Sequence, residues 1–218
     1  MSRAPKAIAV AATKGGTGKT TLTAALAVQA VRDGCDVALI DWEPQGSLTL
    51  WWMMRGKPSN PHMIRDATAP DEAVLTMTHI CDWVFLDTSP SSLELIEQAI
   101  CVADFVLIPV TSSAFDLMAA RSVVDLCKEH SKPFAFVLNR QNARRDVLNA
   151  SARAHLRKLG DVLDQDVQDR TAYVSALNKG KTGPEHPDTK QAREARLEIE
   201  ALWEAVKARA STLEKVDA

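Results

Sequence analysis

The stretch that decides the fold is Thr13-Lys14-Gly15-Gly16-Thr17-Gly18-Lys19-Thr20-Thr21, which follows an apolar run at residues 7–12 and precedes a helical pattern from Leu22 onward. A strand, a glycine-rich turn and a helix N-terminus form the setting of a phosphate-binding loop, or P-loop. The glycines let backbone N–H groups converge on phosphate oxygens. Lys19 supplies a positive charge for the β- and γ-phosphates, and the Thr20 hydroxyl can hold Mg²⁺. A glycine-rich turn without a ligand is the alternative, but the full pattern arises by chance in only on the order of one in 10⁵ such chains.

Length and composition indicate one α/β domain over residues 1–218. Apolar residues make up 46% of the chain and charged residues 25%, which is typical of a globular protein. The net charge of −2 gives no overall attraction to nucleic acid. Binding to DNA would therefore require a local basic patch.

The cysteines and the apolar runs bear on the compartment. The four cysteines show no CxxC spacing and lie in or beside apolar runs, so we expect buried, reduced thiols and no metal site. The first apolar run is too short for a signal peptide, and no run approaches the length of a membrane span. These observations predict a cytoplasmic protein.

Apolar β runs alternate with helical patterns along the chain. We expect strands at residues 7–12, 36–41, 83–87, 105–109 and 134–138, and helices at 19–32, 70–80, 93–102, 114–130 and from 190 to about 213. The strands are nearly continuous in apolar residues, as in parallel sheets that are covered on both faces. This order predicts an α/β fold with a doubly wound, mostly parallel sheet and ligands at the carboxyl ends of its strands.

Acidic residues end two of the expected strands. The second strand runs into Asp41-Trp42-Glu43-Pro44-Gln45-Gly46-Ser47, and the third into Val84-Phe85-Leu86-Asp87. Acids at these ends would lie beside the phosphates, where Mg²⁺ and an attacking water are managed. A solvated turn at Pro44 and Gly46 is the alternative for the first stretch. An apolar run followed by aspartate is the Walker B pattern, which is weak alone and stronger after a P-loop.

Together these motifs resemble the ParA/MinD family of ATPases, whose deviant Walker A box has a second lysine at the position of Lys14. In that family this lysine reaches the nucleotide of the partner subunit. The resemblance implies ATP and Mg²⁺ as cofactors, with the metal held by Thr20, Asp41 and Asp87. It assigns the orientation of the hydrolytic water to Glu43, where the family usually has aspartate. The extra methylene of glutamate displaces the carboxylate, which is consistent with slow turnover.

The likeness is strongest to short ParF-type partition proteins, because the chain opens almost directly on its first strand. It implies that Asn139 contacts adenine, although an asparagine also ends strands as a turn former. The implied catalytic residues are Lys14, Lys19 and Glu43. The implied nucleotide-binding residues are Lys14, Gly15, Gly16, Thr17, Gly18, Lys19, Thr20, Thr21 and Asn139.

A local excess of basic side chains lies between residues 139 and 160. Six basic residues stand there against one acid, Asp146. A solvated helix face is the ordinary explanation of such a run. The resemblance to a family that binds nucleoid DNA non-specifically favours a DNA-binding patch instead. Its expected members are Arg144, Arg145, Arg153, Arg157 and Lys158, with Lys179, Lys181 and Lys190 as an extension.

Two further apolar features have competing explanations. The last helix carries apolar residues at helical spacing, which indicates core packing. A membrane anchor is disfavoured because glutamates interrupt the basic charge that anionic lipid requires, so we expect no membrane partner. Trp51-Trp52-Met53-Met54 is either core or an apolar patch that meets a partner.

The leading functional hypothesis is a ParA-type positioning ATPase. The resemblance implies an ATP-dependent homodimer that binds DNA non-specifically and is nucleoid-associated in that state. A ParB/ParG-like adaptor on the cargo would stimulate hydrolysis. One alternative is a metabolic P-loop enzyme of the dethiobiotin or cobyrinic acid synthase type, and another is a nucleotide-gated binding module with little turnover. The cargo stays open, because fold does not specify it.

Overall fold

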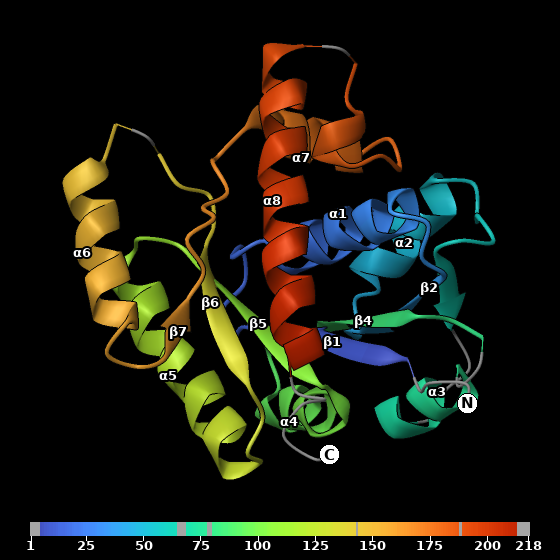
Figure 1. Cartoon of the computed structure of the whole chain (residues 1–218), viewed down its shortest axis with the longest axis horizontal. Helices are drawn as coiled ribbons and strands as arrows, with labels where there is room; N and C mark the ends of the chain where they lie inside the picture. Colours follow the sequence, from blue (N-terminus) through green and yellow to red (C-terminus); the bar gives the residue numbers. More distant parts are fainter. Residues whose placement is uncertain (1–4, 65–68, 78–79, 143, 188, 213–218) are drawn as a thin grey trace.

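The computed structural model describes residues 5–64, 69–77, 80–142, 144–187 and 189–212. Within these ranges one parallel sheet of seven strands has the order β3-β2-β4-β1-β5-β6-β7 (Figure 1). The strands are β1 (Lys6–Val10), β2 (Val37–Trp42), β3 (His62–Ile64), β4 (Trp83–Thr88), β5 (Phe105–Val110), β6 (Phe134–Leu138) and β7 (Asp161–Val162). The predicted doubly wound α/β fold is confirmed.

Helices cover both faces of this sheet. They are α1 (Lys19–Arg32), α2 (Ser47–Met54), α3 (Pro70–Thr76), α4 (Leu93–Val102), α5 (Ala114–Glu129), α6 (Asp146–Leu156), α7 (Thr171–Leu177) and α8 (Lys190–Thr212), with a 3₁₀ helix, η1 (Gly183–Glu185), before α8. One apolar core lies between the sheet and α1, α2, α7 and α8, and a second lies between the sheet and α3 to α6. Alternate residues of β1 enter different cores, since Ile8 and Val10 face the first and Ala7 and Ala9 the second.

The five predicted strands are present, with ends that differ by a few residues. The sequence pattern misses β3 and β7, because strands of three and two residues are too short for a periodic signal. The bounds of α1 and α4 are those predicted, whereas α3 ends at Thr76 rather than at residue 80. Helices α2, α6 and α7 are additional elements of eight, eleven and seven residues.

The predicted core role of the last helix is confirmed. Ile199, Leu202 and Trp203 of α8 have no exposed surface, and the Trp203 ring packs edge-on against Trp83 with ring centroids 4.9 Å apart. Among the described helices, none combines the length and the apolarity needed to cross a bilayer. The expected end of α8 near residue 213 lies outside the described residues.

The motif at residues 51–54 divides between core and surface. Trp51 and Trp52 are buried, and their indole N–H groups donate to the backbone oxygens of Lys181 and Pro61. Met53 and Met54 are exposed. The core explanation is therefore confirmed for the two tryptophans, and a partner contact at the exposed methionines stays a prediction.

The segment between α7 and α8 is fastened to α2. The Arg55 guanidinium makes two hydrogen bonds to Glu185, at 2.7 and 2.8 Å, and one to the Gly180 carbonyl oxygen at 3.1 Å. Gly180 has a φ of +65°, and a Cβ there would lie 2.3 Å from the backbone nitrogen of Arg55. Glycine is therefore required at this close approach.

The expectation of four buried thiols is wrong for Cys101. Cys127 is buried and Cys35 and Cys81 are half-buried, but Cys101 is exposed. It is the last but one residue of α4 and lies on the exposed side of that helix. An apolar neighbourhood in sequence does not fix which face of a helix a single residue occupies.

Candidate nucleotide-binding site

The site lies at the carboxyl edge of the sheet, where β1, β2, β4 and β6 end. A cavity of about 350 Å³ opens there, and its wall includes Gly15, Gly18, Lys19, Thr20, Glu43 and Asn139. The volume is in the range of small-molecule sites. Most residues of the predicted site therefore meet in one cavity. Lys14, Thr17, Asp41, Asp87 and the basic patch are not among its lining residues.

The tight bend of the P-loop depends on Gly18. Its φ is +91°, and a Cβ there would lie 2.2 Å from Nδ2 of Asn139. That amide donates a hydrogen bond of 2.7 Å to the Thr17 carbonyl oxygen, and Asn139 is buried. Asn139 thus braces the P-loop, a role that the sequence does not reveal because the two residues are distant in the chain. Its contact with adenine stays a prediction.

A second brace comes from Arg140, which follows Asn139 with a φ of +53°. Its Nη1 donates to the Gly16 carbonyl oxygen at 3.1 Å, and its Nε donates to Asp169 at 3.3 Å. Arg140 also lines the cavity. Its charge therefore belongs to the nucleotide site rather than to the basic run in which the sequence places it.

The two lysines of the P-loop point to different places. Lys19 is buried in the cavity wall, and its Nζ lies 3.4 Å from the Lys14 carbonyl oxygen. Burial lowers the pKa of Lys19, and the carboxylates of Asp87 and Glu43 oppose that effect. The Lys14 ammonium lies instead 2.6 Å from Oδ1 of Asp116 at the start of α5 and 5.5 Å from the Phe115 ring centre. Within its own chain, Lys14 does not line the phosphate cavity.

Asp87 is a fully buried carboxylate beneath the P-loop. The Thr20 hydroxyl donates to its Oδ2 at 2.5 Å, and its Oδ1 accepts no hydrogen bond from the described residues. Burial raises the pKa of Asp87 to about 7, with a further rise from the Asp41 charge. An orphaned carboxylate oxygen beside a threonine hydroxyl fits Mg²⁺, which uses one or two protein ligands together with phosphates and water. Thr20 and Asp87 would hold the ion.

Asp41 stands next to Asp87 in strand register. Its Oδ2 accepts a 2.7 Å hydrogen bond from the Thr49 backbone N–H, and its Oδ1 lies 3.4 Å from the Glu43 backbone N–H. Burial raises the pKa of Asp41, and these backbone donors counteract it. Asp41 therefore fixes the first turn of α2 and adds negative charge beside the Thr20–Asp87 pair. Its contact with the metal stays a prediction.

Glu43 projects into the same cavity from the loop after β2. Its Oε1 is 3.4 Å from the Ser89 hydroxyl and 3.5 Å from the Gln45 backbone nitrogen. Ser89 is fully buried after β4. The Glu43 carboxylate, which stands where the resemblance implies an aspartate, therefore has a hydroxyl donor within reach.

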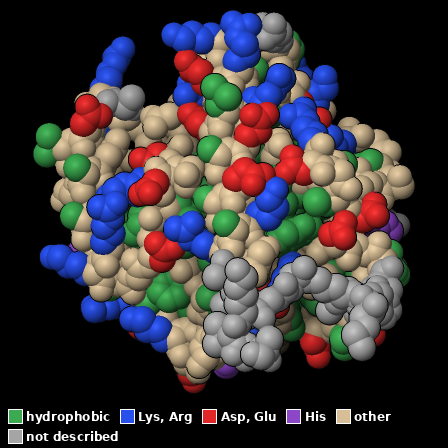
Figure 2. Space-filling model, viewed as in Figure 1, with side chains coloured by type: hydrophobic (Ala, Val, Ile, Leu, Met, Phe, Trp, Pro, Cys, Tyr) green, Lys and Arg blue, Asp and Glu red, His purple; other side chains and the backbone are tan. Residues whose placement is uncertain are grey.

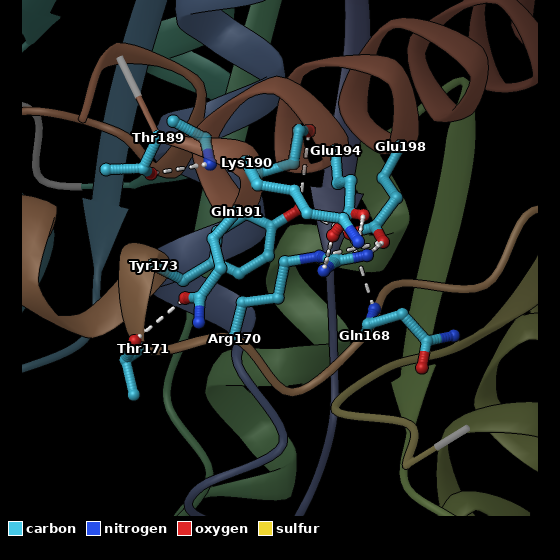
Figure 3. Close-up of polar contacts among 11 residues, drawn as sticks. Gln168, Arg170, Thr171, Tyr173, Thr189, Lys190, Gln191, Glu194 and Glu198 are labelled. Carbon is cyan, nitrogen blue, oxygen red and sulfur yellow. Dashed lines mark hydrogen bonds and ion pairs between the residues drawn. The ribbon is translucent and has the colours of Figure 1, made fainter. Parts of the chain in front are cut away.

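The part of the cavity wall that comes from Arg170 and Tyr173 is fastened to α8 by polar contacts (Figure 3). The Arg170 guanidinium donates to Glu198 at 2.6 and 3.0 Å and also pairs with Glu194. The Tyr173 hydroxyl donates to the other Glu198 oxygen at 3.0 Å. Arg170 and Tyr173 both line the cavity. This network was not predicted from the sequence, where its only signal is the placement of two glutamates one turn apart on the last helix.

The predicted DNA-binding residues do not form one equivalent set. Arg144, Arg145, Arg157 and Lys158 are exposed. Figure 2 shows basic side chains at the left of the molecule, where Figure 1 places α6. Arg153 is different, because its guanidinium pairs with Asp166 and donates to the Leu163 carbonyl oxygen at 2.6 Å. Asp164 also lies 3.6 Å from Arg157. The predicted excess of positive charge is therefore reduced by acids beyond residue 160, and Arg153 is a structural cation.

Comparisons with known proteins identify the family. The profile of the CobQ/CobB/MinD/ParA nucleotide binding domain matches residues 8–183. The maintenance of carboxysome distribution protein A of Halothiobacillus neapolitanus is 31% identical over 183 residues, covering 79% of this chain and 84% of that protein. Protein ParA of Rhizobium radiobacter is 27% identical over 186 residues, covering 79% and 82%.

Solved structures support the same fold. The MinC:MinD cell division complex of Aquifex aeolicus matches with a TM-score of 0.74 and 16% identity, over 93% of this chain and 96% of that one. A putative plasmid partition protein of Borrelia burgdorferi bound to AMPPNP matches with a TM-score of 0.70 and 16% identity, over 93% and 100%. With the P-loop, the buried Thr20–Asp87 pair and the separate Lys14 on one parallel sheet, the chain belongs to the ParA/MinD family of P-loop ATPases.

Proposed function

We propose that the chain is a positioning ATPase that binds Mg²⁺-ATP at the P-loop cavity and hydrolyses it slowly. The observation that carries this proposal is the buried Asp87, whose Oδ2 accepts from the Thr20 hydroxyl and whose Oδ1 accepts no hydrogen bond from the residues that the structure describes. Such a group is costly to bury and is useful where it meets a cation. Bound Mg²⁺ would neutralise charge on the β- and γ-phosphates.

The residues around the phosphates have distinct proposed roles. Lys19 and the loop amides from Gly15 to Thr21 bind the phosphates, while Asp87 and Thr20 orient the ion, with Asp41 beside them. Glu43 orients the attacking water, and the Ser89 hydroxyl restrains its carboxylate. Asn139 serves in two ways, since its Nδ2 braces the P-loop and its oxygen is the acceptor available to an adenine amino group.

Lys14 supports the proposal of an ATP-dependent homodimer. The Lys14 side chain is 44% exposed, and its ammonium pairs with Asp116 outside the cavity that Lys19 lines. We propose that it contacts the γ-phosphate bound to a second subunit. Lys14→Ala should then abolish ATP-driven dimerisation and hydrolysis while the affinity for ATP falls only a few-fold, because Lys19 and the loop amides remain.

Light scattering at fixed protein concentration tests the dimer. The parent should double its mass with ATP and not with ADP, and Lys14→Ala should stay monomeric with either nucleotide. Lys128→Ala, at an exposed lysine near the end of α5, is the matched control and should dimerise like the parent. A parent mass that ignores ATP would exclude the sandwich dimer.

We further propose that the dimer binds DNA without sequence preference and releases it when a ParB/ParG-like adaptor on the cargo stimulates hydrolysis. This assigns the protein to the nucleoid in its ATP state. The exposed residues Arg144, Arg145, Arg157 and Lys158 would make the phosphate contacts. Two patches joined by dimerisation bind more strongly than one through effective concentration.

The DNA proposal needs variants that spare the fold. Arg144 and Arg145 changed together to Gln should lower DNA affinity in the ATP state and flatten its salt dependence by about 0.9 log units per lost phosphate contact. Arg153→Gln is unsuitable, because it would break the pair with Asp166. Filter binding across a salt series with ATP and ADP in parallel measures this. An ATP-bound dimer that ignores DNA would favour the metabolic-enzyme alternative.

A further inference from the structure

A second reactive cluster lies away from the nucleotide site, at the opposite ends of the helices. Cys101 is near the C-terminus of α4, and His130 caps the C-terminus of α5. The Cys101 sulfur is 3.5 Å from Nδ1 of His130, and Nε2 of His130 is 2.7 Å from a carboxylate oxygen of Glu97. In a parallel α/β fold these helix ends lie at the amino edge of the sheet, whereas nucleotide binds at the carboxyl edge. Figure 1 shows α4 and α5 as neighbours below the sheet.

The order of the three groups fixes the role of the imidazole. A carboxylate only accepts hydrogen bonds, so the Nε2 that faces Glu97 carries the proton. In the neutral ring Nδ1 is then a lone-pair acceptor, and it is the atom that faces the Cys101 thiol. A thiol beside an imidazole that a carboxylate orients is the arrangement that generates a thiolate nucleophile.

Cys101 differs from the other cysteines in its surroundings. Burial raises the pKa of Cys127 to about 12 and that of Cys81 to about 11, and it also raises the pKa of Cys35. Those thiols stay protonated and poorly reactive. Cys101 is exposed and has a base in contact, so it is the thiol of this chain that combines access with activation.

A cavity lies beside the thiol, between α3 and α4. It measures about 390 Å³, and Cys101, Glu97, Gln98 and Pro70 are among its lining residues. Asp71 and Glu94 add two more carboxylates to the wall. Such a wall repels anions and attracts cations, so the charge of a reagent should affect its access to the sulfur.

We propose that Cys101 is a site of covalent thiol modification by a small neutral or cationic disulfide that occupies this cavity. His130 takes the thiol proton at Nδ1, and the thiolate attacks one sulfur of the reagent. The S–S bond of the reagent breaks and a Cys101–S–S–R bond forms. The displaced thiolate takes up the proton and leaves as RSH, so that the exchange consumes no separate oxidant.

Glu97 acts as a positioning residue and His130 as the general base. Removing the base should slow modification at neutral pH on the order of tenfold or more. Removing the carboxylate should slow it less, because the ring can still accept the proton in one of its orientations. An amide oxygen at position 97 retains the hydrogen-bond acceptor, so Glu97→Gln should recover part of the rate that Glu97→Ala loses.

Intact-protein mass spectrometry of the full chain with cystamine, a cationic disulfide, tests the proposal. We expect one adduct on the parent, none at this rate on Cys101→Ser, and a slower reaction for His130→Gln. Oxidised glutathione, which is anionic, should react more slowly than cystamine with the parent, relative to their rates with free cysteine. Cys35→Ser is the matched control and should keep the parent rate, while thermal unfolding confirms that every variant is folded.

Each measurement can overturn the assignment. A folded His130→Gln variant that reacts at the parent rate would show that the imidazole does not activate the thiol. Equal adduct formation on Cys101→Ser would place the reactive thiol elsewhere. A preference for oxidised glutathione would contradict the role of Asp71, Glu94 and Glu97 in selecting the reagent.

Discussion

Replacing Asp87 by Asn should make the chain more stable in the absence of magnesium and nucleotide. The carboxylate has no exposed surface, and one of its oxygens accepts no hydrogen bond from the described residues. Its pKa rises from 3.8 to about 7, chiefly because burial disfavours the charged form. At about 1.4 kcal/mol per pKa unit, the ionised group lowers the free energy of unfolding by at most about 4 kcal/mol.

The pH dependence follows from the direction of the pKa change. Below about pH 4 the Asp87 carboxyl is protonated in both the folded and the unfolded chain, and it does not lower the free energy of unfolding. As the pH rises from there to about 7, the unfolded chain releases the proton while the folded chain retains it, so the parent loses stability. The loss is complete above pH 7 and less than half complete at pH 5. An amide does not titrate, so the advantage of Asp87→Asn should grow over the same interval.

The expected gain is about 2 kcal/mol at pH 8, roughly half of the upper limit, because Lys19 loses a neighbouring charge and the new amide N–H needs a partner. That corresponds to a rise in Tm of about 4–8 °C for a chain of this size. Urea unfolding at pH 5 and pH 8 with EDTA measures it, and Asp125→Asn on the exposed side of α5 is the control. The same variant should gain little Tm from Mg²⁺-ATP, since a proposed ligand of the metal is lost. No gain at pH 8, or an equal gain at pH 5, would refute this account of Asp87.

Four further substitutions test the rest of the site. Glu43→Ala should lower the rate of ATP hydrolysis, measured as phosphate release, by on the order of a hundredfold, while the affinity for ATP stays within a few-fold of the parent value. An unchanged rate would remove Glu43 from the water-orienting role. Gly18→Ala should abolish nucleotide binding in calorimetry, because its Cβ would lie 2.2 Å from the Asn139 amide at a φ of +91°. Arg170→Leu should destabilise the fold by about 3 kcal/mol in urea unfolding, because it removes the cation that pairs with Glu198 and leaves that carboxylate with the uncharged Tyr173 hydroxyl, and Glu198→Gln should be milder.

The sequence predicts the carboxyl edge of the sheet well because its signals are local. The P-loop, Asp41 and Asp87 each follow an apolar strand, and parallel strands bring their ends together whatever the loops contain. The brace from Asn139 to Thr17 is a different case, since 122 residues separate its two ends. Neither local pattern nor composition indicates which distant carbonyl oxygen an amide will reach.

The basic run between residues 139 and 160 is a second case in which the sequence does not reveal the partners of a side chain. Counting charges between residues 139 and 160 treats neighbours in sequence as neighbours in space. In the fold Arg140 turns to the P-loop and Arg153 turns to Asp166, which lies beyond the counted stretch. The charge of a surface patch can be estimated only after the basic side chains that pair with acids of other elements have been left out. Those pairs depend on the tertiary structure and cannot be read from the sequence.

Contacts at the site suggest an order for its proposed steps. Asp87 and Lys19 are both buried at an energetic cost, and bound Mg²⁺ and phosphates would relieve that cost within one subunit. Lys14 is already paired with Asp116, so it gains from a second nucleotide only by exchanging one anionic partner for another. Lys14 is half-exposed but Asp116 is buried, so the release of Lys14 leaves that carboxylate with the Thr111 hydroxyl as a partner and carries a cost that the second nucleotide must offset. Nucleotide binding should consequently come first and be favourable in the monomer, while closure of the dimer follows as a separate step that includes the transfer of Lys14.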